Sequence, residues 1–242
     1  MQLSVVIPTY NEAENLPKLV SALFALPIPD FHILFVDDNS PDGTGDLAEK
    51  LGVQNGGRVS VLRRPGKMGL GTAYLDGFRY ALKQGAQVVV QMDADFSHPP
   101  QKVIELVDAL QTCDVAIGSR YIAGGKLDDS WPLWRKALSG FGNTYARTIL
   151  SLSTRDITAG FRAWRRDTLL AMPLYQVRSN GYAFQVEMAY LASRLGFRLC
   201  EIPIYFADRR WGQSKMSLKI QVEAAVRVWQ LLYQYRHLHK IR

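Results

Sequence analysis

Short apolar runs alternate with amphipathic segments through the first half of the chain. The runs cover 3–8, 33–36, 59–62, 88–92 and 114–118, and segments typical of helices lie between them at 13–24, 46–51, 72–83 and 101–111. Strands that alternate with helices indicate βαβ units, because a right-handed crossover places a helix between parallel neighbours. The sequence therefore predicts an α/β fold with a mixed, mostly parallel sheet flanked by helices.

The second half continues without a linker. No low-complexity tract, repeat or Pro/Gly/Ser-rich spacer divides the 242 residues, so we expect a single domain over 1–216 followed by a basic amphipathic helix over 217–242. A Gly-rich loop over 123–132 precedes a predicted helix over 135–150, and long loops of this kind often close over substrates. We further predict a tight turn over 158–162, a helix over 181–194, a strand over 199–206 and a helix over 218–235.

Two acidic residues follow the apolar run that begins at Val88. A strand there places Asp93 and Asp95 at its carboxyl end, where open α/β sheets bind ligands. Two carboxylates one residue apart can reach a single divalent cation, and Mg²⁺ or Mn²⁺ binds such a pair weakly until phosphate oxygens complete its shell. The alternative is that Asp95 forms only an Asx-turn ahead of a helix that starts near Pro99.

Other polar residues follow the predicted strands in the same way. Parallel strands end at one edge of the sheet, so this edge should gather their side chains on a common rim. The rim residues are Tyr10, Glu12, Asp37, Asp38, Asp93, Asp95 and Arg120. Asp38 ends the second strand, where acidic residues accept hydrogen bonds from a ribose or a base in nucleotide-binding sheets. Each acidic turn taken alone is also explained as a solvated connection.

Positive charge is concentrated near the C-terminus. The net charge of +7 and the pI near 9.4 imply an anionic partner. Apolar residues recur there at helical spacing, at Val222, Ala225, Val226, Trp229, Leu232 and Tyr233. This pattern is typical of a helix lying on an anionic membrane surface, and equally of a helix whose apolar face packs on the domain. We expect no nucleic-acid partner, because the predicted rim is acidic and would repel a phosphate backbone.

Several classes of protein are excluded by what the sequence lacks. No G-x-x-x-x-G-K-[ST] occurs, and no G-x-G-x-x-G follows the first strand, which argues against P-loop and dinucleotide-binding folds. Cys113 and Cys200 lie far apart without further ligands nearby, so we predict buried free thiols rather than a zinc site or a disulfide. We also expect neither a signal peptide nor a transmembrane segment, because no basic leader and no run of about 18 apolar residues is found.

Five motifs carry a family resemblance. They are Val6–Glu12, Val36–Thr44, Met92–Asp95, Gly118–Tyr121 and Gly212–Lys215. In this order they resemble the inverting GT-A glycosyltransferases of family 2, which have a Rossmann-like fold. More closely, the chain resembles the polyprenol (dolichol) phosphate mannose synthases.

The resemblance implies a set of site residues. Those implied to hold the guanosine of the donor are Pro8, Tyr10, Glu12, Val36 and Asp38. Those implied to hold the metal and the sugar diphosphate are Asp93, Ala94 and Asp95, with Ser97 at a third ligand position. Those implied to meet phosphates or mannose are Arg120, Arg209 and Lys215. Arg135 and Ser139 fall where the family meets the acceptor phosphate, and the residues expected to be catalytic are Asp95, Arg120 and Arg135.

The implied reaction is transfer of mannose from GDP-mannose to a polyprenyl (dolichyl) phosphate, with Mg²⁺ or Mn²⁺ as cofactor. It would take place at the cytoplasmic face of a membrane, to which the protein would bind peripherally. A phosphate monoester is already anionic near pH 7, so such an acceptor needs no dedicated general base. Two alternatives stay open: the same fold acting with another nucleotide sugar such as UDP-glucose on a lipid phosphate or a saccharide, and a catalytically silent subunit.

Overall fold

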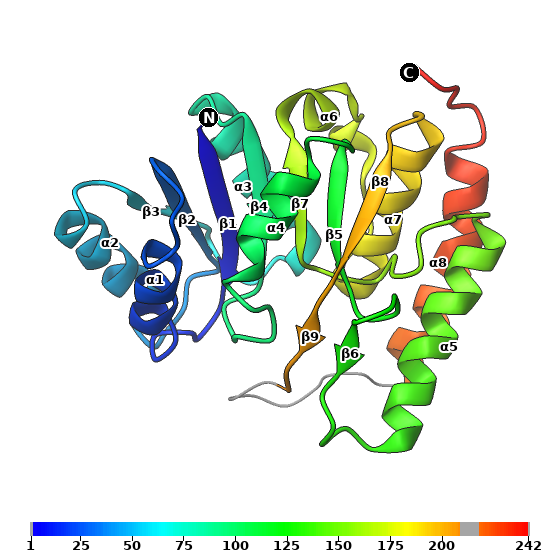
Figure 1. Ribbon diagram of the computed structural model, residues 1–242, viewed down its shortest axis with the longest axis horizontal. Helices are drawn as coiled ribbons and strands as arrows, with labels where there is room; N and C mark the ends of the chain where they lie inside the picture. Colours follow the sequence, from blue (N-terminus) through cyan, green and yellow to red (C-terminus); the bar gives the residue numbers. More distant parts are fainter. Residues whose placement is uncertain (1, 209–217, 242) are drawn as a thin grey trace.

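A seven-stranded sheet forms the centre of the molecule and is covered by helices on both faces (Figure 1). It is seen in a computed structural model, which describes residues 2–208 and 218–241. The strand order is β3-β2-β1-β4-β7-β5-β8, and neighbours are parallel except in the two pairs that include β7. The strands are β1 (Leu3–Thr9), β2 (Phe31–Asp37), β3 (Val59–Arg63), β4 (Val88–Gln91), β5 (Val115–Ser119), β7 (Arg162–Arg165) and β8 (Leu199–Pro203).

The predicted alternation of strands and helices in the first half is confirmed. Each expected element is present there, with its ends moved by a few residues. The helices along the chain are α1 (Leu16–Phe24), α2 (Thr44–Gln54), α3 (Leu70–Lys83), α4 (Lys102–Ala109), α5 (Leu133–Ile149), α6 (Arg166–Ala171), α7 (Gly181–Arg194) and α8 (Leu218–Gln234), with a 3-10 turn η1 (Leu174–Gln176). The mostly parallel sheet flanked by helices is therefore as expected.

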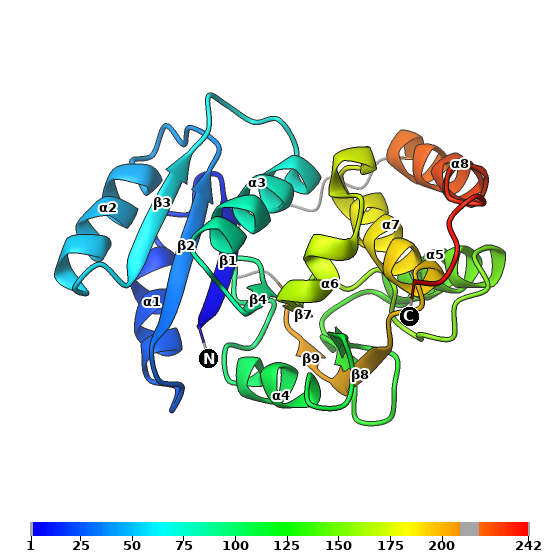
Figure 2. The ribbon, with the colours of Figure 1, turned by 90° about the horizontal axis from the view of Figure 1, so that it is seen from above.

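Two apolar layers lie on opposite faces of the sheet, beneath the helices that cover each face in the view from above (Figure 2). One layer packs under α1, α2 and α4, and the other under α3, α5, α7 and α8. Successive valines of β4 point to different layers, Val89 to the second and Val88 and Val90 to the first. A strand buried on both faces needs a continuous apolar run, which explains the sequence of β4.

Strand β7 was not predicted. The sequence analysis assigned a tight turn to 158–162, whereas a strand begins at Arg162 and runs antiparallel between β4 and β5. Four residues with an arginine at each end carry no strand signal of their own. Only the neighbouring strands make this segment extended, since they supply hydrogen-bonding partners on both sides.

The long loop between β5 and α5 contributes one strand to a small second sheet. In it β6 (Lys126–Leu127) pairs in parallel with β9 (Tyr205–Phe206). The single strand predicted over 199–206 is consequently divided into β8 and β9, with the break after Pro203. At this break the backbone of Ile204 bonds to both sheets. Its N–H donates to the carbonyl of Ser119 on β5, and its carbonyl accepts from the N–H of Lys126 on β6. The loop is thus fixed to the edge of the main sheet.

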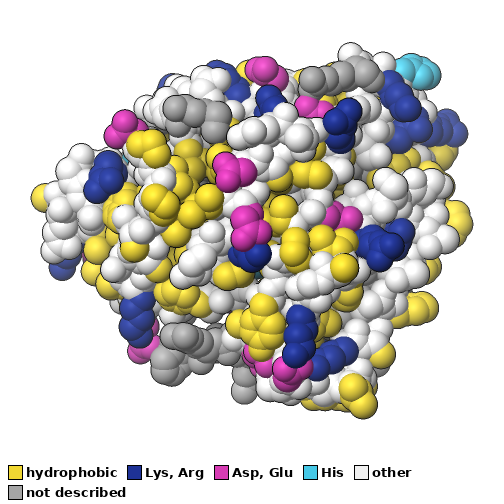
Figure 3. Space-filling view, viewed as in Figure 1, with side chains coloured by type: hydrophobic (Ala, Val, Ile, Leu, Met, Phe, Trp, Pro, Cys, Tyr) yellow, Lys and Arg dark blue, Asp and Glu magenta, His cyan; other side chains and the backbone are white. Residues whose placement is uncertain are grey.

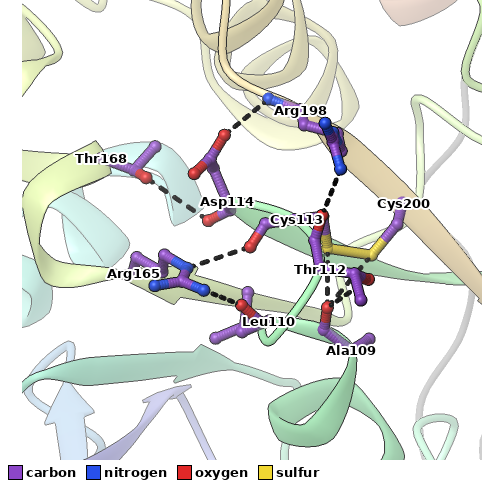
Figure 4. Close-up of a disulfide and its surroundings, with 9 residues drawn as sticks. All are labelled: Ala109, Leu110, Thr112, Cys113, Asp114, Arg165, Thr168, Arg198 and Cys200. Atoms are coloured by element: carbon purple, nitrogen blue, oxygen red, sulfur yellow. Dashed lines mark hydrogen bonds between the residues drawn. A yellow bond between two sulfur atoms is a disulfide. The ribbon is translucent and has the colours of Figure 1, made fainter.

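The two cysteines form a disulfide, so the prediction of free thiols was wrong (Figure 4). Cys113 lies two residues before the start of β5, and Cys200 lies on β8, the parallel neighbour of β5. Their Cα atoms are 6.0 Å apart, within the range that a disulfide spans. The separation of 87 residues gave no hint of this proximity, which depends on how β5 and β8 pair.

Helix α8 packs against α5 and α7 (Figure 1). Val228, Leu231 and Tyr235 are buried in that contact. The hydroxyl of Tyr235 donates a 2.7 Å hydrogen bond to Glu187 of α7, which is itself fully buried. The interpretation that an apolar face of this segment packs on the domain therefore holds for these residues. The opposite face of α8 remains exposed.

Candidate active site

The carboxyl ends of β1, β2, β4 and β5 meet at the lower edge of the sheet in Figure 1. Thr9 and Asp37 are register partners at the ends of β1 and β2, and the hydroxyl of Thr9 donates to Asp37 Oδ1 at 3.2 Å. The turns after these strands carry most of the predicted rim residues. The sheet thus brings together segments that are far apart in the sequence, as expected from parallel topology.

Two acids of the turn after β2 hold the loops in place. Asp37 is almost fully buried and accepts hydrogen bonds from Thr9 and from both the N–H and the hydroxyl of Ser40. Asp42 accepts from the N–H and the hydroxyl of Thr44 at the start of α2, and from the N–H of Ala13. These hydrogen bonds explain Asp37 and Asp42 as residues that stabilise the turns, without any role in ligand binding.

Asp38 has a different environment. Arg64, also buried, donates to Asp38 Oδ1 at 2.6 Å and to the hydroxyl of Thr72 at 2.6 Å, and its Nε lies 3.2 Å from Asp76 Oδ2. Burial raises the pKa of Asp38 more than the charge and hydrogen bond of Arg64 lower it. Arg64 holds Asp38 against the start of α3, so this carboxylate is presented in one fixed orientation at the rim.

The other residues expected to bind guanosine lie around Asp38. Pro8 and Val36 are register partners in β1 and β2, with Val36 fully buried in the core. Tyr10 lies at the surface beneath the ammonium of Lys67, 4.0 Å from the ring centroid. Glu12 accepts from the side-chain amide of Asn15, and its N–H donates to Thr44. Of this set, Tyr10 is exposed, whereas Asp38 is buried against Arg64.

Asp93 and Asp95 lie on the turn that follows β4. Asp93 Oδ1 accepts a 2.8 Å hydrogen bond from the hydroxyl of Tyr74, a fully buried residue of α3. The N–H of Asp93 donates to His98 Nδ1 at 3.0 Å, and the ring of His98 stacks on Phe161. The side chain of Asp93 is therefore anchored to α3, and its backbone to the ring of His98.

Ser97 supports Asp95 directly. Its N–H and its hydroxyl both donate to Asp95 Oδ1, at 3.0 and 2.6 Å. The Asx-type turn that the sequence left open is present, and it forces Phe96 into the left-handed region with φ +62°. A residue other than glycine in that conformation costs about 1 kcal/mol, which the hydrogen bonds of the turn offset.

The oxygen atoms of this turn are of the kind that a hard divalent cation binds. Asp93, Asp95 and Ser97 carry side-chain oxygens within five residues on a non-helical segment, and His98 Nδ1 already accepts a hydrogen bond from a backbone donor. Within 2–208 and 218–241, no group of three or more His, Cys, Asp and Glu is placed to hold a metal. Two carboxylates leave several positions for phosphate oxygens and water, as Mg²⁺ and Mn²⁺ sites commonly do.

Arg120 follows β5 and is locked to a buried partner. Its Nε and Nη2 donate to the two oxygens of Asp156, at 2.8 and 2.7 Å, and Nη2 also donates to the hydroxyl of Thr158. Burial lowers the pKa of Arg120, but Asp156 more than offsets this and holds it above its usual value. The turn over 156–160 thereby fixes the guanidinium at the rim.

Residues of α5 complete this side of the rim. The hydroxyl of Ser139 is 2.7 Å from that of Tyr121, the residue after Arg120. The guanidinium of Arg135 lies over the ring of Trp131, at 3.5 Å from its centroid, and 3.4 Å from Asp208. The predicted acceptor residues are thus on one helix, next to the segment that carries Arg120. Arg209 and Lys215 lie outside the described residues.

The partners of these residues were not predicted from the sequence. They are Arg64, Tyr74, His98 and Asp156. Arg64 follows β3 just as the acids follow β1, β2 and β4, so its position at a strand end was a usable signal. Tyr74 and Asp156 gave none, because a tyrosine in an amphipathic helix and an acid in a turn have ordinary structural explanations.

Comparison with known proteins identifies the family. Residues 4–170 match the family described as Glycosyl transferase family 2. An undecaprenyl-phosphate mannosyltransferase from Micrococcus luteus is 46% identical over 240 residues, covering 98% of each chain. A polyprenol monophosphomannose synthase from Mycolicibacterium smegmatis is 49% identical over 214 residues, covering 88% of this chain and 80% of its own.

Solved structures share the fold at low sequence identity. Glucosyl-3-phosphoglycerate synthase from Mycobacterium tuberculosis, in complex with Mn²⁺, UDP and phosphoglyceric acid, is similar with a TM-score of 0.68 at 16% identity, covering 99% of this chain and 80% of its own. Mannosyl-3-phosphoglycerate synthase from Rubrobacter xylanophilus has a TM-score of 0.68 at 17% identity, covering 100% and 77%. A mannosyltransferase from Pyrobaculum calidifontis in complex with GDP-Man and Mn²⁺ has a TM-score of 0.64 at 16% identity, covering 96% and 64%. The chain therefore belongs to glycosyl transferase family 2 and has its GT-A fold.

Proposed function

We propose that this protein transfers mannose from GDP-mannose to a polyprenyl (dolichyl) phosphate, with inversion at the anomeric carbon, giving polyprenyl phosphate mannose and GDP. The identity of 46 to 49% to two relatives named for mannosyl transfer onto polyprenyl phosphates is the observation that carries this proposal. The arrangement of the rim supports it, because Asp38, the Asp93–Asp95 turn and Arg120 follow one another along one sheet edge, at the ends of β2, β4 and β5.

The donor would lie along the ends of β1, β2 and β4. Asp38, held by Arg64, would accept hydrogen bonds from the base, and Tyr10 would cover it. The diphosphate would reach the Asp93–Asp95 turn with Ala94 between the two acids. Mg²⁺ or Mn²⁺ held by Asp93 and Asp95, with Ser97 nearby, would supply positive charge that offsets the departing diphosphate. Arg209 and Lys215 are proposed to add to that charge.

The acceptor would approach from α5. Its phosphate is the nucleophile and is already ionised near neutral pH, so the protein has to orient it rather than deprotonate it. Arg120 and Arg135 would contact phosphate oxygens, and Ser139 would donate its hydroxyl. The ion pair of Arg120 with Asp156 keeps that guanidinium in place before the acceptor arrives.

A membrane surface is proposed as the third partner. Leu133, Trp134 and Phe141 of α5 are more than two-thirds exposed, and Val226, Trp229 and Tyr233 of α8 more than half. Hydrophobic side chains are visible along α5 at the right of Figure 3, with Lys and Arg close by. None of the helices that the structure describes has the length and apolar character needed to span a bilayer. We propose peripheral binding through α5 and α8, at the cytoplasmic face.

Vesicle sedimentation tests this surface. Trp134→Ala combined with Trp229→Ala should weaken binding to vesicles that contain anionic lipid, because both indole rings are exposed. Leu170→Ala is the control, since Leu170 is also exposed but lies on α6. Equal binding by both variants and the wild type would refute the assignment to α5 and α8.

The reaction is tested with labelled GDP-mannose and a short polyprenyl phosphate, with Mn²⁺ or with EDTA, and with UDP-glucose as a second donor. We expect metal-dependent mannolipid from GDP-mannose alone. Asp95→Asn should abolish it, whereas Asp167→Asn, which changes an exposed aspartate of α6, should not. Product from UDP-glucose would favour the alternative donor, which the UDP complex of a structural relative keeps open. No product from either donor would favour a silent subunit.

A further inference from the structure

Arg162, the first residue of β7, is fully buried yet has no acidic partner among the described residues. Its Nε and Nη2 donate to the backbone carbonyls of Ala159 and Ile157, at 2.9 and 2.8 Å, and Nη1 has no hydrogen bond. The other two buried arginines at the rim are neutralised, Arg64 by Asp38 and Arg120 by Asp156. Asp156 attracts Arg162 but is already paired with Arg120, so the charge of Arg162 is only partly compensated in the interior, which costs folding free energy.

The position of Arg162 places this charge beneath the candidate site. Its Cα is the register partner of Gln91 on β4, two residues before Asp93, and of Ile117 on β5, three residues before Arg120. Its charge acts on Tyr74, whose hydroxyl is bonded to Asp93; burial and Asp93 hold the pKa of Tyr74 well above its usual value, and Arg162 acts in the opposite direction. Burial lowers the pKa of Arg162 to about 9, so it stays charged at neutral pH.

The charges of the proposed donor complex show what this arginine can balance. A divalent cation and the carboxylates of Asp93 and Asp95 sum to zero. The sugar diphosphate then brings two negative charges, which Arg209 and Lys215 are proposed to offset in part. The arginines that already have carboxylate partners offset them only weakly, so a further positive charge nearby still favours the diphosphate.

We propose that Arg162 is a buried countercharge that favours binding of the nucleoside diphosphate through the interior of the protein, without touching it. This inference rests on the proposed function, since it requires a diphosphate at the Asp93–Asp95 turn. Arg162 is thus a positioning residue that contributes by its charge and not by contact. The competing explanation is purely structural, in which Arg162 only braces the turn over 157–159.

Calorimetric titration of GDP in the presence of Mn²⁺ separates the two roles. R162M removes the charge and keeps the length of the side chain, while R162K keeps the charge and loses the fork of hydrogen bonds. Two unit charges on the order of 10 Å apart change a binding constant by roughly tenfold at an effective dielectric constant of about 20, so loss of a nearby charge should weaken GDP binding by roughly tenfold or more. R162K should stay within about threefold of the wild type by the same reasoning. R165M is the control, because Arg165 also donates to backbone carbonyls but lies at the far end of β7.

A second ligand strengthens the test. The loss in R162M should be larger for GDP than for GMP, because a charge effect grows with the charge of the ligand, whereas a collapsed turn weakens both alike. Wild-type affinity in R162M, or an equal loss in R162K and R162M, would overturn the inference. If R162M does not fold, the GDP affinity of R162K separates the two roles. A structural role that needs the forked hydrogen bonds of the guanidinium predicts weak GDP binding by R162K, whereas a charge role predicts binding close to that of the wild type. Failure of the wild type to bind GDP with Mn²⁺ would instead overturn the proposed function.

Discussion

The hydrogen bond from Tyr74 to Asp93 can be removed with almost no other change. Tyr74 is fully buried, its ring stacks on Phe184 at 5.9 Å and tilts against Phe78 at 5.9 Å, and both contacts survive in Tyr74→Phe. What is lost is one donor, 2.8 Å from Asp93 Oδ1. The carboxylate of Asp93, whose side chain is 29% exposed, then stays accessible to a ligand but is no longer held in one orientation.

The size of the effect follows from the kind of bond. A hydrogen bond to a charged group contributes about 1.5 to 3 kcal/mol, and loss of a group that orients a metal ligand typically weakens metal affinity or activity by about 10- to 100-fold. We therefore expect Tyr74→Phe to weaken binding of Mn²⁺ with GDP by about tenfold or more. Thermal stability should fall only by the loss of this one hydrogen bond, because no cavity is made.

The assay is titration of GDP and Mn²⁺ together, with transfer rates measured on the same preparations. Tyr80→Phe is the matched control, as Tyr80 lies on the same helix and packs at the edge of the same apolar layer. If Tyr74→Phe binds the metal–nucleotide pair as tightly as the wild type, orientation of Asp93 by Tyr74 is not needed and the reasoning fails. A loss equal to that of Tyr80→Phe would point to packing instead.

Two further predictions concern stability. Because the disulfide closes a separation of 87 residues, reduction of the wild type should lower the free energy of unfolding by about 4 to 5 kcal/mol, and denaturant curves of Cys200→Ser should not respond to reductant. Burial raises the pKa of Asp156, but Arg120 outweighs this effect and holds the pKa below its usual value. The ionised Asp156 therefore contributes to the free energy of unfolding above about pH 4, and this contribution is lost as pH falls through the pKa of the folded state. Asp156→Asn should cost about 3 kcal/mol at pH 7, with the gap to the wild type narrowing below about pH 4; a gap that is constant with pH would contradict this.

Elements with strong local patterns were predictable from the sequence. The apolar runs of β1, β2 and β4 are continuous because both faces of each strand are buried. The segments between these runs have apolar residues at helical spacing, which makes the strand and helix boundaries easy to recognise. By contrast, β7 and the bond between Cys113 and Cys200 depend on neighbours distant in sequence. No local signal marks such pairings, and both were missed for that reason.

The candidate site shows the same division. Its location followed from strand ends, and the acids at those ends were identified. The sequence did not predict which of these acids are available to a ligand, because availability depends on hydrogen-bonding partners such as Ser40 for Asp37 and Arg64 for Asp38. Topology sets where polar groups gather, and hydrogen bonds among them decide which are left to act.

The place of β7 in the sheet also affects how the protein is made. β7 lies between β4 and β5, although it leaves the ribosome after both. Strands β1 to β4 can pair as they are synthesised. In contrast, β5 is not hydrogen-bonded to any of these strands and joins their sheet only through β7 (Arg162–Arg165). Until then its buried residues Val115 and Ile117 are exposed, and a nascent chain of this kind is open to aggregation or chaperone binding. The Asp93–Asp95 turn should therefore form early, and Arg120 should be anchored only when Asp156 arrives.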